Sequence, residues 1–479
     1  MEVTMKHLTK TVSLLLCLAV LLAFAACTPN ENPSATPSPS GNTEQTDLEL
    51  QYLKSGDVYR LYHWWLQPGQ EDTEFSDDSI VSRYRTQTLA TLRDDYGVTV
   101  RFIANTGSYW DEVRSSAYSG EPIADGMHGG SVANAIDHYW YLEMPGSCLE
   151  AISDHNISFD DDTYWDVEQQ QEFCTFNGKL YGFVMNQVGM KTVETAKVTF
   201  FNYDIVKEAG YTPAQLYKMV KDKTWNWDVF EDICAKVTDP DKGVYGTTWY
   251  DLGLQLAESN NTTIITTIEN NGESFDAFTG YDSNASEAWN FLKSLYDRGY
   301  TLSLGEGKFD REAIGAFKNG KVAFMINHWR RTWETGIIDN CGWLPVPMGP
   351  KATDYVSEVQ PGECFVIFKG CTNPDGLLKA MKMLYRPIYA KGSAENDLLF
   401  NSEISEYCMD QDSIDFLYYL QSITKQSKAV YYGINFEYMS LESTTKILTG
   451  EATAAQYFES VAPVYNEKID RVSRRELLS

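Results

Sequence analysis

One strand–helix–strand unit constrains the architecture of this chain more than any other pattern. Residues 58–65, VYRLYHWW, are rich in β-branched and aromatic side chains, which is typical of a strand. Residues 80–96 place apolar and aromatic side chains at four-residue spacing, which indicates a helix that ends at Gly97. Residues 98–102 then alternate between apolar and polar side chains, as a second strand does. Two strands joined through a helix favour a parallel sheet, so the pattern predicts an α/β fold.

The start of the chain indicates export. After a short basic stretch, residues 12–26 form an apolar run that ends in small side chains, the layout of a secretory signal. The run is shorter than the roughly 20 residues that span a membrane. The small residues before Cys27 resemble the lipobox of bacterial lipoproteins, where cleavage precedes a lipidated cysteine, although Phe24 replaces the usual Leu. We expect residues 1–26 to be a signal peptide and Cys27 to carry lipid, palmitate included; an ordinary cleavable signal is the alternative.

A polar stretch follows the leader. Residues 28–47 are dominated by Pro, Ser, Thr, Asn and Glu, and such a stretch cannot bury enough apolar surface to fold. We expect residues 27–50 to form a flexible tether between the lipid and a folded body. No apolar segment beyond the leader is long enough to span a bilayer. The sequence therefore predicts an extracytoplasmic protein that is attached to the cell membrane through a lipid anchor only.

The charge and cysteine content exclude several classes of partner. The formal net charge of −28 repels phosphate backbones, so we expect no nucleic-acid partner. Seven of the nine cysteines follow Cys27, an odd number that cannot pair completely, and one or two disulfides among them stay open. There is no CxxC motif and no His at ligand spacing from a cysteine pair, so we expect no metal and no cofactor.

Six segments of the folded body form a recognisable set in chain order. They are NGKLYGFVMN (177–186), VTFFNYDIVKEAGY (198–211), KTWNWDVFEDICAKVTD (223–239), FKNGKVAFMINHWRRTW (317–333), CGWLPVPMGP (341–350) and ILTGEATAAQYFESVAPVYNEKI (447–469). Behind a lipobox and a tether, this set resembles the family 1 extracellular solute-binding proteins of ATP-driven importers, which are broadly similar to maltose-binding protein. One departure is Tyr203, where the family carries a lysine.

The resemblance implies a fold and a domain organisation. Roughly 430 residues follow the leader and tether, enough for two large lobes. The family fold is α/β and of the periplasmic-binding-protein type, with two lobes joined by hinge strands and a helical C-terminal part. By resemblance, lobe one takes residues 51–188 and 327–372, and lobe two takes residues 189–326 and 373–479. The chain would then cross between the lobes near Asn186, Asn327 and Asn373.

The resemblance also implies a ligand and a partner. The ligand of such a protein is most often a sugar, and an oligosaccharide in particular. The protein partner is the permease of an ABC importer, and we expect the chain itself to be a monomer. Sugars bind through flat aromatic surfaces and directed hydrogen bonds from carboxylates, amides and Arg.

Candidate ligand-binding residues follow the predicted strands, because ligands of open α/β sheets sit beyond the carboxyl ends of strands. Trp64 and Trp65 end the first strand and face opposite sides, so at most one belongs to the core. His128 lies in a Gly-rich turn, where a merely solvated role is the alternative. The second lobe adds Trp249, Tyr250 and Asp251.

The resemblance adds candidates at the hinge. Asn186 follows the strand of the first crossing, and Trp329 and Arg330 follow the strand KVAFMIN at the second. We expect Trp329 to be a stacking platform for a pyranose ring, with a core indole as the alternative. Arg330 has a structural ion pair as its alternative role. Glu363 lies in QPGECFVI, where the family often turns a polar loop toward the ligand.

Two other classes of protein stay open as alternatives. The 67 acidic residues allow a carboxylate pair, as in a secreted glycan-acting hydrolase. However, no HExxH, GxSxG, P-loop or GxGxxG motif stands in a supporting context, so we expect no enzyme. A surface adhesin lipoprotein is the second alternative, and an extended aromatic face without a closing hinge would favour it.

Overall fold

The computed structural model describes residues 48–473, except residues 64–65, 72–74, 76–78, 108, 132–147, 251, 271, 304–308, 333–339 and 409. The chain divides into two units, Met1–Leu48 and Glu49–Ser479, and the described elements belong to the second. The expected signal peptide, Cys27 and most of the expected tether lie outside the described residues. None of the described helices combines the length and the apolar character needed to cross a membrane.

The folded body begins slightly before the expected boundary at residue 51. Residues 48–50 are helical, and Glu49 is buried. Its carboxylate lies 2.9 Å from Lys379 Nζ and 2.8 Å from Lys382 Nζ. Burial lowers the pKa of Lys379, and the adjacent Glu49 opposes that effect. A buried ammonium needs such a counter-charge, so Glu49 is part of the fold and not of the tether.

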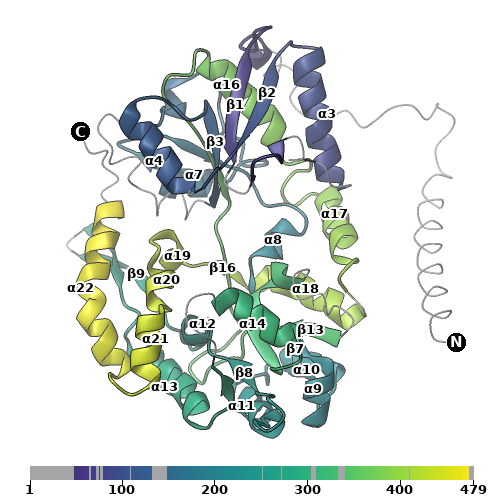
Figure 1. Ribbon diagram of the computed structural model, residues 1–479, viewed down its shortest axis with the longest axis vertical. Coiled ribbons are helices and arrows are strands. Elements are labelled where there is room, and N and C mark those ends of the chain that lie inside the picture. The colour runs from purple at the N-terminus through teal and green to yellow at the C-terminus, as the bar shows by residue number, and fades with distance from the viewer. Residues whose placement is uncertain are drawn as a thin grey trace, which may run out of the picture. The chain divides into compact units, whose positions relative to one another are not determined.

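The first lobe is built on a five-stranded sheet of order β2-β1-β3-β15-β6 (Figure 1). Its strands are β1 (Val58–His63), β2 (Thr99–Ala104), β3 (Gly126–Ser131), β6 (Gly182–Val184) and β15 (Glu363–Ile367). β1 runs parallel to β2 and β3, and β15 runs antiparallel to both β3 and β6. Helix α3 (Ile80–Asp94) connects β1 to β2, so the predicted strand–helix–strand unit is confirmed.

Helices and loops cover both faces of this sheet. Alternation along β1 sends Leu61 to one apolar core and Tyr62 to the other. On the first face, α3 contacts α16 (Pro374–Tyr385), and their buried Leu92 and Leu377 belong to one core. The other elements of this lobe are α4 (Tyr109–Ser119), η3 (Ile152–Asp154), α7 (Val167–Phe173), β4 (Thr175–Phe176) and β5 (Lys179–Leu180).

The second lobe holds a three-stranded antiparallel sheet of order β12-β7-β13. Every residue of the middle strand β7 (Lys197–Asn202) is buried between β12 (Phe324–His328) and β13 (Cys341–Leu344). This sheet has its own apolar core, distinct from those of the first. Its helices are α9 (Tyr203–Glu208), α10 (Pro213–Lys221), α11 (Trp227–Val237), α12 (Leu252–Ser259), α13 (Ser283–Asp297), α14 (Phe309–Lys318) and the short η4 (Trp329–Arg331).

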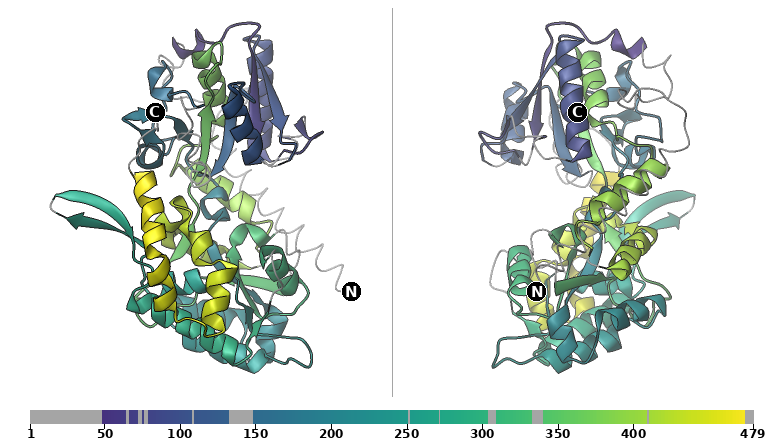
Figure 2. Two further views of the ribbon diagram at one scale, coloured as in Figure 1. Left: turned by 60° about the vertical axis from the view of Figure 1, so that its left-hand side comes forward. Right: turned by 90° about the vertical axis from the view of Figure 1, so that its right-hand side faces the viewer.

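Small strand pairs and C-terminal helices complete the fold. Figure 2 shows the antiparallel hairpin of β9 (Ile265–Asn270) and β10 (Glu273–Phe278) projecting from the second lobe. The remaining pairs are β8 (Thr247–Thr248) with β11 (Thr301–Leu302), and β14 (Ser357–Val359) with β16 (Thr424–Gln426). The C-terminal part is helical, as predicted: α17 (Ala394–Ile404), α18 (Gln411–Ile423), α19 (Lys428–Tyr431), α20 (Ile434–Tyr438), α21 (Leu441–Leu448) and α22 (Ala454–Ser473).

Two of the three expected crossings lie elsewhere in the structure. β13 pairs with β7 in the second sheet, so the chain returns to the first sheet only between Leu344 and Glu363, and not near Asn327. Close packing fixes β13 there, because a Cβ at Gly342 would lie 2.6 Å from the Phe201 ring. Helix α16 packs on the first sheet, so the last crossing follows Tyr385 rather than Asn373.

Candidate functional site

Two histidines lie together on neighbouring parallel strands, His63 at the carboxyl end of β1 and His128 in the middle of β3, where a Gly-rich turn was expected. His63 ends β1 and is paired in register with His128 of β3. Their rings stack with centroids 5.3 Å apart, and both side chains are buried. His63 Nε2 lies 2.9 Å from the hydroxyl of Tyr385, the last residue of α16. Ligands of open α/β sheets bind beyond the carboxyl ends of the strands. At the carboxyl end of β1, which we call the edge of the first sheet, His63, His128 and Tyr385 pack against one another.

Glu363 brings a carboxylate to the same edge. It begins β15, which runs antiparallel to β3, so the start of β15 meets the end of β3. Glu363 Oε2 lies 3.4 Å from His128 Nε2, and Oε1 lies 3.9 Å from the ammonium of Lys191. Lys191 begins the short helix α8 (Lys191–Glu194) and also lies 2.8 Å from Glu194 Oε2. Glu363 thus joins the first sheet to the segment that leads into the second lobe.

The surroundings of Glu363 and Lys191 favour the charged form of each side chain. Burial by itself would raise the pKa of Glu363, but Lys191, His128 and Arg85 together hold it well below its ordinary value. Burial lowers the pKa of Lys191, yet Glu363 and Glu194 raise it above its ordinary value overall. The site therefore presents an ionised carboxylate and an ionised ammonium at neutral pH.

An open cavity of about 730 Å³ lies beside α8. Helix α17 forms one wall, and the first turn of α3 forms another; Figure 1 shows α3, α8 and α17 near one another. Glu403 of α17 accepts a hydrogen bond from the Met190 amide at 2.7 Å, and burial raises the pKa of this carboxyl. The lining combines aromatic, carboxylate, cationic and apolar side chains, among them Tyr389, Tyr407, Glu395, Glu406, Arg83 and Leu399. Its size and mixture suit a small organic ligand.

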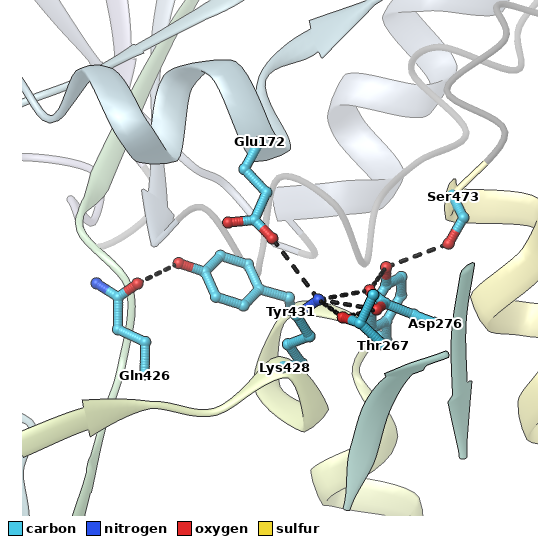
Figure 3. Close-up of polar contacts among 8 residues, drawn as sticks. Glu172, Thr267, Asp276, Gln426, Lys428, Tyr431 and Ser473 are labelled. Carbon is cyan, nitrogen blue, oxygen red and sulfur yellow. Dashed lines mark hydrogen bonds and ion pairs between the residues drawn. The ribbon is translucent and has the colours of Figure 1, made fainter. Parts of the chain in front are cut away.

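A second contact joins α7 to the C-terminal helices (Figure 3). Phe173 stacks on Tyr431 of α19 with ring centroids 3.4 Å apart, and the Tyr431 hydroxyl donates to Gln426 Oε1 at 2.7 Å. Beside this stack, Lys428 Nζ lies 2.8 Å from Asp276 Oδ1 and 3.9 Å from Glu172 Oε1. Burial by itself would raise the pKa of Asp276, but hydrogen bonds, the one from Lys428 foremost, hold it below its ordinary value.

The expected stacking platform has a different place. Trp329 is 0 % exposed and lies in the core of the second lobe. Its ring meets Trp343 of β13 at 5.8 Å and Tyr407 at 5.7 Å, both edge to face. No face of the indole is open to a sugar in this structure. The expectation of a platform is therefore corrected in favour of a core indole, which the sequence had left as the alternative.

The other expected residues divide into four groups. The structure brings His128 and Glu363 together, as described above. Asn186 is buried and donates to the Asp162 carbonyl at 2.6 Å, which is a structural role at the first crossing. Trp249 is buried in the second core, Tyr250 packs against that core, and Arg330 is partly exposed on η4. Trp64, Trp65 and Asp251 lie outside the described residues.

Sequence reasoning missed His63, Lys191 and Tyr385. His63 lies inside the predicted strand of residues 58–65, whereas candidates were taken only from the end of that strand, Trp64 and Trp65. Lys191 and Tyr385 come from helix ends whose approach to the sheet depends on long-range packing. Within the described residues, no group of three or more His, Cys, Asp or Glu side chains is arranged to hold a metal ion.

The chain matches the model of a known protein family. The description of that family is bacterial extracellular solute-binding protein, and the match covers residues 87–385. Since the match spans more than half of the chain, the chain belongs to this family. A comparison with curated protein sequences found no match.

Solved structures share the fold at low sequence identity. The GacH receptor of Streptomyces glaucescens, solved unliganded and with acarbose, is similar with a TM-score of 0.58 and 16% identity over 86% of this chain and 99% of that chain. An ABC substrate-binding protein of Listeria monocytogenes in complex with cycloalternan is similar with a TM-score of 0.58 and 15% identity, over 86% of this chain and 99% of that chain. Maltose-bound MalE3 of T. maritima is similar with a TM-score of 0.54 and 16% identity, over 86% of this chain and 99% of that chain. The chain therefore has the two-lobed α/β fold of these binding proteins.

Proposed function

We propose that the protein captures a carbohydrate, an oligosaccharide in particular, outside the cytoplasm and delivers it to an ABC importer. The observations behind this proposal are the ionised pair of Glu363 and Lys191 and a cavity of about 730 Å³ that is lined by Met190, the residue before Lys191, and by tyrosine and glutamate side chains. Carboxylates accept hydrogen bonds from sugar hydroxyls, and tyrosine rings cover the apolar faces of pyranoses. The neighbours solved with acarbose, cycloalternan and maltose support the same ligand class.

Glu363 and Lys191 are proposed to link ligand capture to closure of the lobes. Glu363 belongs to a strand of the first sheet, whereas Lys191 lies on the segment that enters the second. A sugar hydroxyl that bonds to both would favour the conformation in which these two segments are close. His128 is buried, so it positions Glu363 rather than contacting the sugar. No bond in the ligand is made or broken, and the importer permease recognises the closed form.

We also propose the arrangement of the protein at the cell surface. Cys27 carries the lipid, and the polar residues that follow it hold the folded body near the membrane. The body works as a monomer without nucleic acid or a cofactor. Trp64, Trp65 and Asp251 stay proposed ligand contacts.

A thermal-unfolding panel tests the proposal. The chain lacking its leader is heated with single mono- and oligosaccharides, including maltose, acarbose and cycloalternan. A cognate sugar at a hundredfold its Kd stabilises the protein by about 2.7 kcal/mol and raises the Tm by a few degrees. Glu363→Gln should reduce this shift. The matched control Glu442→Gln, on an exposed helical pair with Lys446, should keep it. A panel without any shift contradicts the proposal, and recovery of a cleaved sugar moves the protein to the hydrolases.

A further inference from the structure

Two cysteines from distant parts of the chain meet beside the candidate site. Cys174 follows α7, and Cys364 is the second residue of β15. Their Sγ atoms lie 3.8 Å apart although 190 positions separate them in sequence. Both side chains are buried, with 5% and 1% exposed.

The surrounding backbone holds both sulfur atoms in place. The Cys174 amide donates to the Gln170 carbonyl at 3.0 Å, and the Cys174 carbonyl accepts from the Tyr181 amide at 2.9 Å. Cys364 is paired in register with Val184 of β6. A Cβ at Gly182 would lie 2.8 Å from Cys364 Sγ, so the glycine leaves room for the sulfur.

We propose that Cys174 and Cys364 are a modification site that closes to a disulfide. The compartment suits this reaction, because the family is extracellular and thiols outside the cytoplasm meet oxidants. The sulfur atoms need to approach from 3.8 Å to about 2.05 Å, the length of a disulfide bond. Because the side chains are buried, the reaction takes place while the first lobe folds or during its local opening.

The co-reactant is a disulfide donor, either a small oxidised thiol or a protein disulfide. One cysteine loses its proton, and its thiolate attacks one sulfur of the donor disulfide; this forms a mixed disulfide, the donor S–S bond breaks, and the other donor sulfur leaves as a thiolate. The second cysteine then loses its proton and attacks the mixed disulfide, which expels the other half of the donor. Two cysteine thiols are oxidised to one disulfide, and one donor disulfide is reduced to two thiols.

The bond would act on two functional neighbours. Glu363 precedes Cys364, and Phe173, which stacks on Tyr431, precedes Cys174. A covalent link between Cys174 after α7 and Cys364 in β15 therefore fixes the Glu363 carboxylate relative to the stack of Phe173 on Tyr431. It also closes a long loop, which restricts the unfolded chain more than a short loop does.

Thiol mapping tests the proposal on the full, exported chain. The protein is denatured without reductant, alkylated with N-ethylmaleimide and digested. Cys174 and Cys364 should stay unlabelled and appear in one cross-linked peptide that reductant separates, with an intact mass about 2 Da below that of the reduced chain. Cys341, a buried thiol of the second lobe, is the internal control and should be labelled. Full labelling of Cys174 and Cys364, persisting after refolding with oxidised glutathione, overturns the proposal.

A second measurement is independent of the mapping. Reductant should lower the Tm of the parent protein by several degrees and leave the Tm of the Cys174→Ser/Cys364→Ser variant unchanged. Cys341→Ser should respond to reductant as the parent does. An equal response of the parent and the double variant overturns the proposal. If the double variant does not fold, the decision rests on the parent's mapping.

Discussion

Phe173 and Tyr431 stack face to face, with ring centroids 3.4 Å apart and planes inclined by 9°. Phe173 ends α7, which contacts β6 of the first sheet, whereas Tyr431 ends α19 among the C-terminal helices. Tyr431 is nevertheless buried in an apolar core of the first lobe. The stack is therefore a direct apolar joint between the two lobes.

Two substitutions distinguish the contribution of the stacked rings to stability from that of the Tyr431 hydroxyl. Phe173→Ala removes a buried ring and should cost about 3–5 kcal/mol of unfolding free energy. Tyr431→Phe keeps the stack and loses the hydrogen bond to Gln426, which should cost about 1 kcal/mol. Denaturant unfolding measures both values. Equal losses in the two variants would show that the stack itself contributes little.

Trp329 should behave as a core residue. Trp329→Ala leaves a cavity between Trp343 and Tyr407 and should cost about 3–5 kcal/mol of unfolding free energy. The sugar affinity of the folded fraction should hardly change. Thermal unfolding and sugar titration on the same variant check this. A variant that keeps the parent's Tm but loses sugar binding would restore the platform role.

Glu363 should make stability depend on pH. Its folded-state pKa lies below the ordinary 4.5, so the unfolded chain binds its proton first as the pH falls. The stabilisation by its charge is fully present above about pH 5 and is lost as the pH drops through the lowered folded-state pKa. The gap in unfolding free energy between the parent and Glu363→Gln should therefore narrow from pH 6 to pH 4. A gap that widens in acid is incompatible with this assignment, and Glu442→Gln serves as the exposed control.

Cys27 should decide where the protein is found. Cys27→Ser removes the thiol that the expected lipid needs, so the chain should appear in the soluble fraction after export. Fractionation of cells, followed by detection of the folded body, measures the change. A variant that stays as membrane-bound as the parent rejects the lipid anchor.

Local patterns predicted part of this structure well. The strand–helix–strand unit through Leu92 follows from periodicity within short segments. His128 was chosen because it follows a predicted strand and Glu363 because of the family resemblance, and antiparallel pairing of β15 with β3 brings them 3.4 Å apart. The rule that ligands lie beyond strand ends needs no knowledge of distant contacts.

Long-range packing decided the rest. The chain turns at Trp329 in a short 3₁₀ helix, and the indole meets Trp343 from β13 and Tyr407 from beyond α17, which no local pattern indicates. The lobe assignment of β13 depends on its partner strand, since an apolar strand fits either sheet equally well. Glu49 looked like tether because its partners, Lys379 and Lys382, lie far along the chain.

Carbohydrate capture is the central claim, and calorimetric titration tests it most directly. The folded body is titrated with the sugar that gives the largest thermal shift, and the sugar is then recovered and analysed by chromatography. The account predicts saturable binding of one sugar per chain, a negative heat-capacity change, weaker binding by Glu363→Gln and an unchanged sugar. Absence of binding by every sugar of the panel, or recovery of a cleaved product, would contradict it.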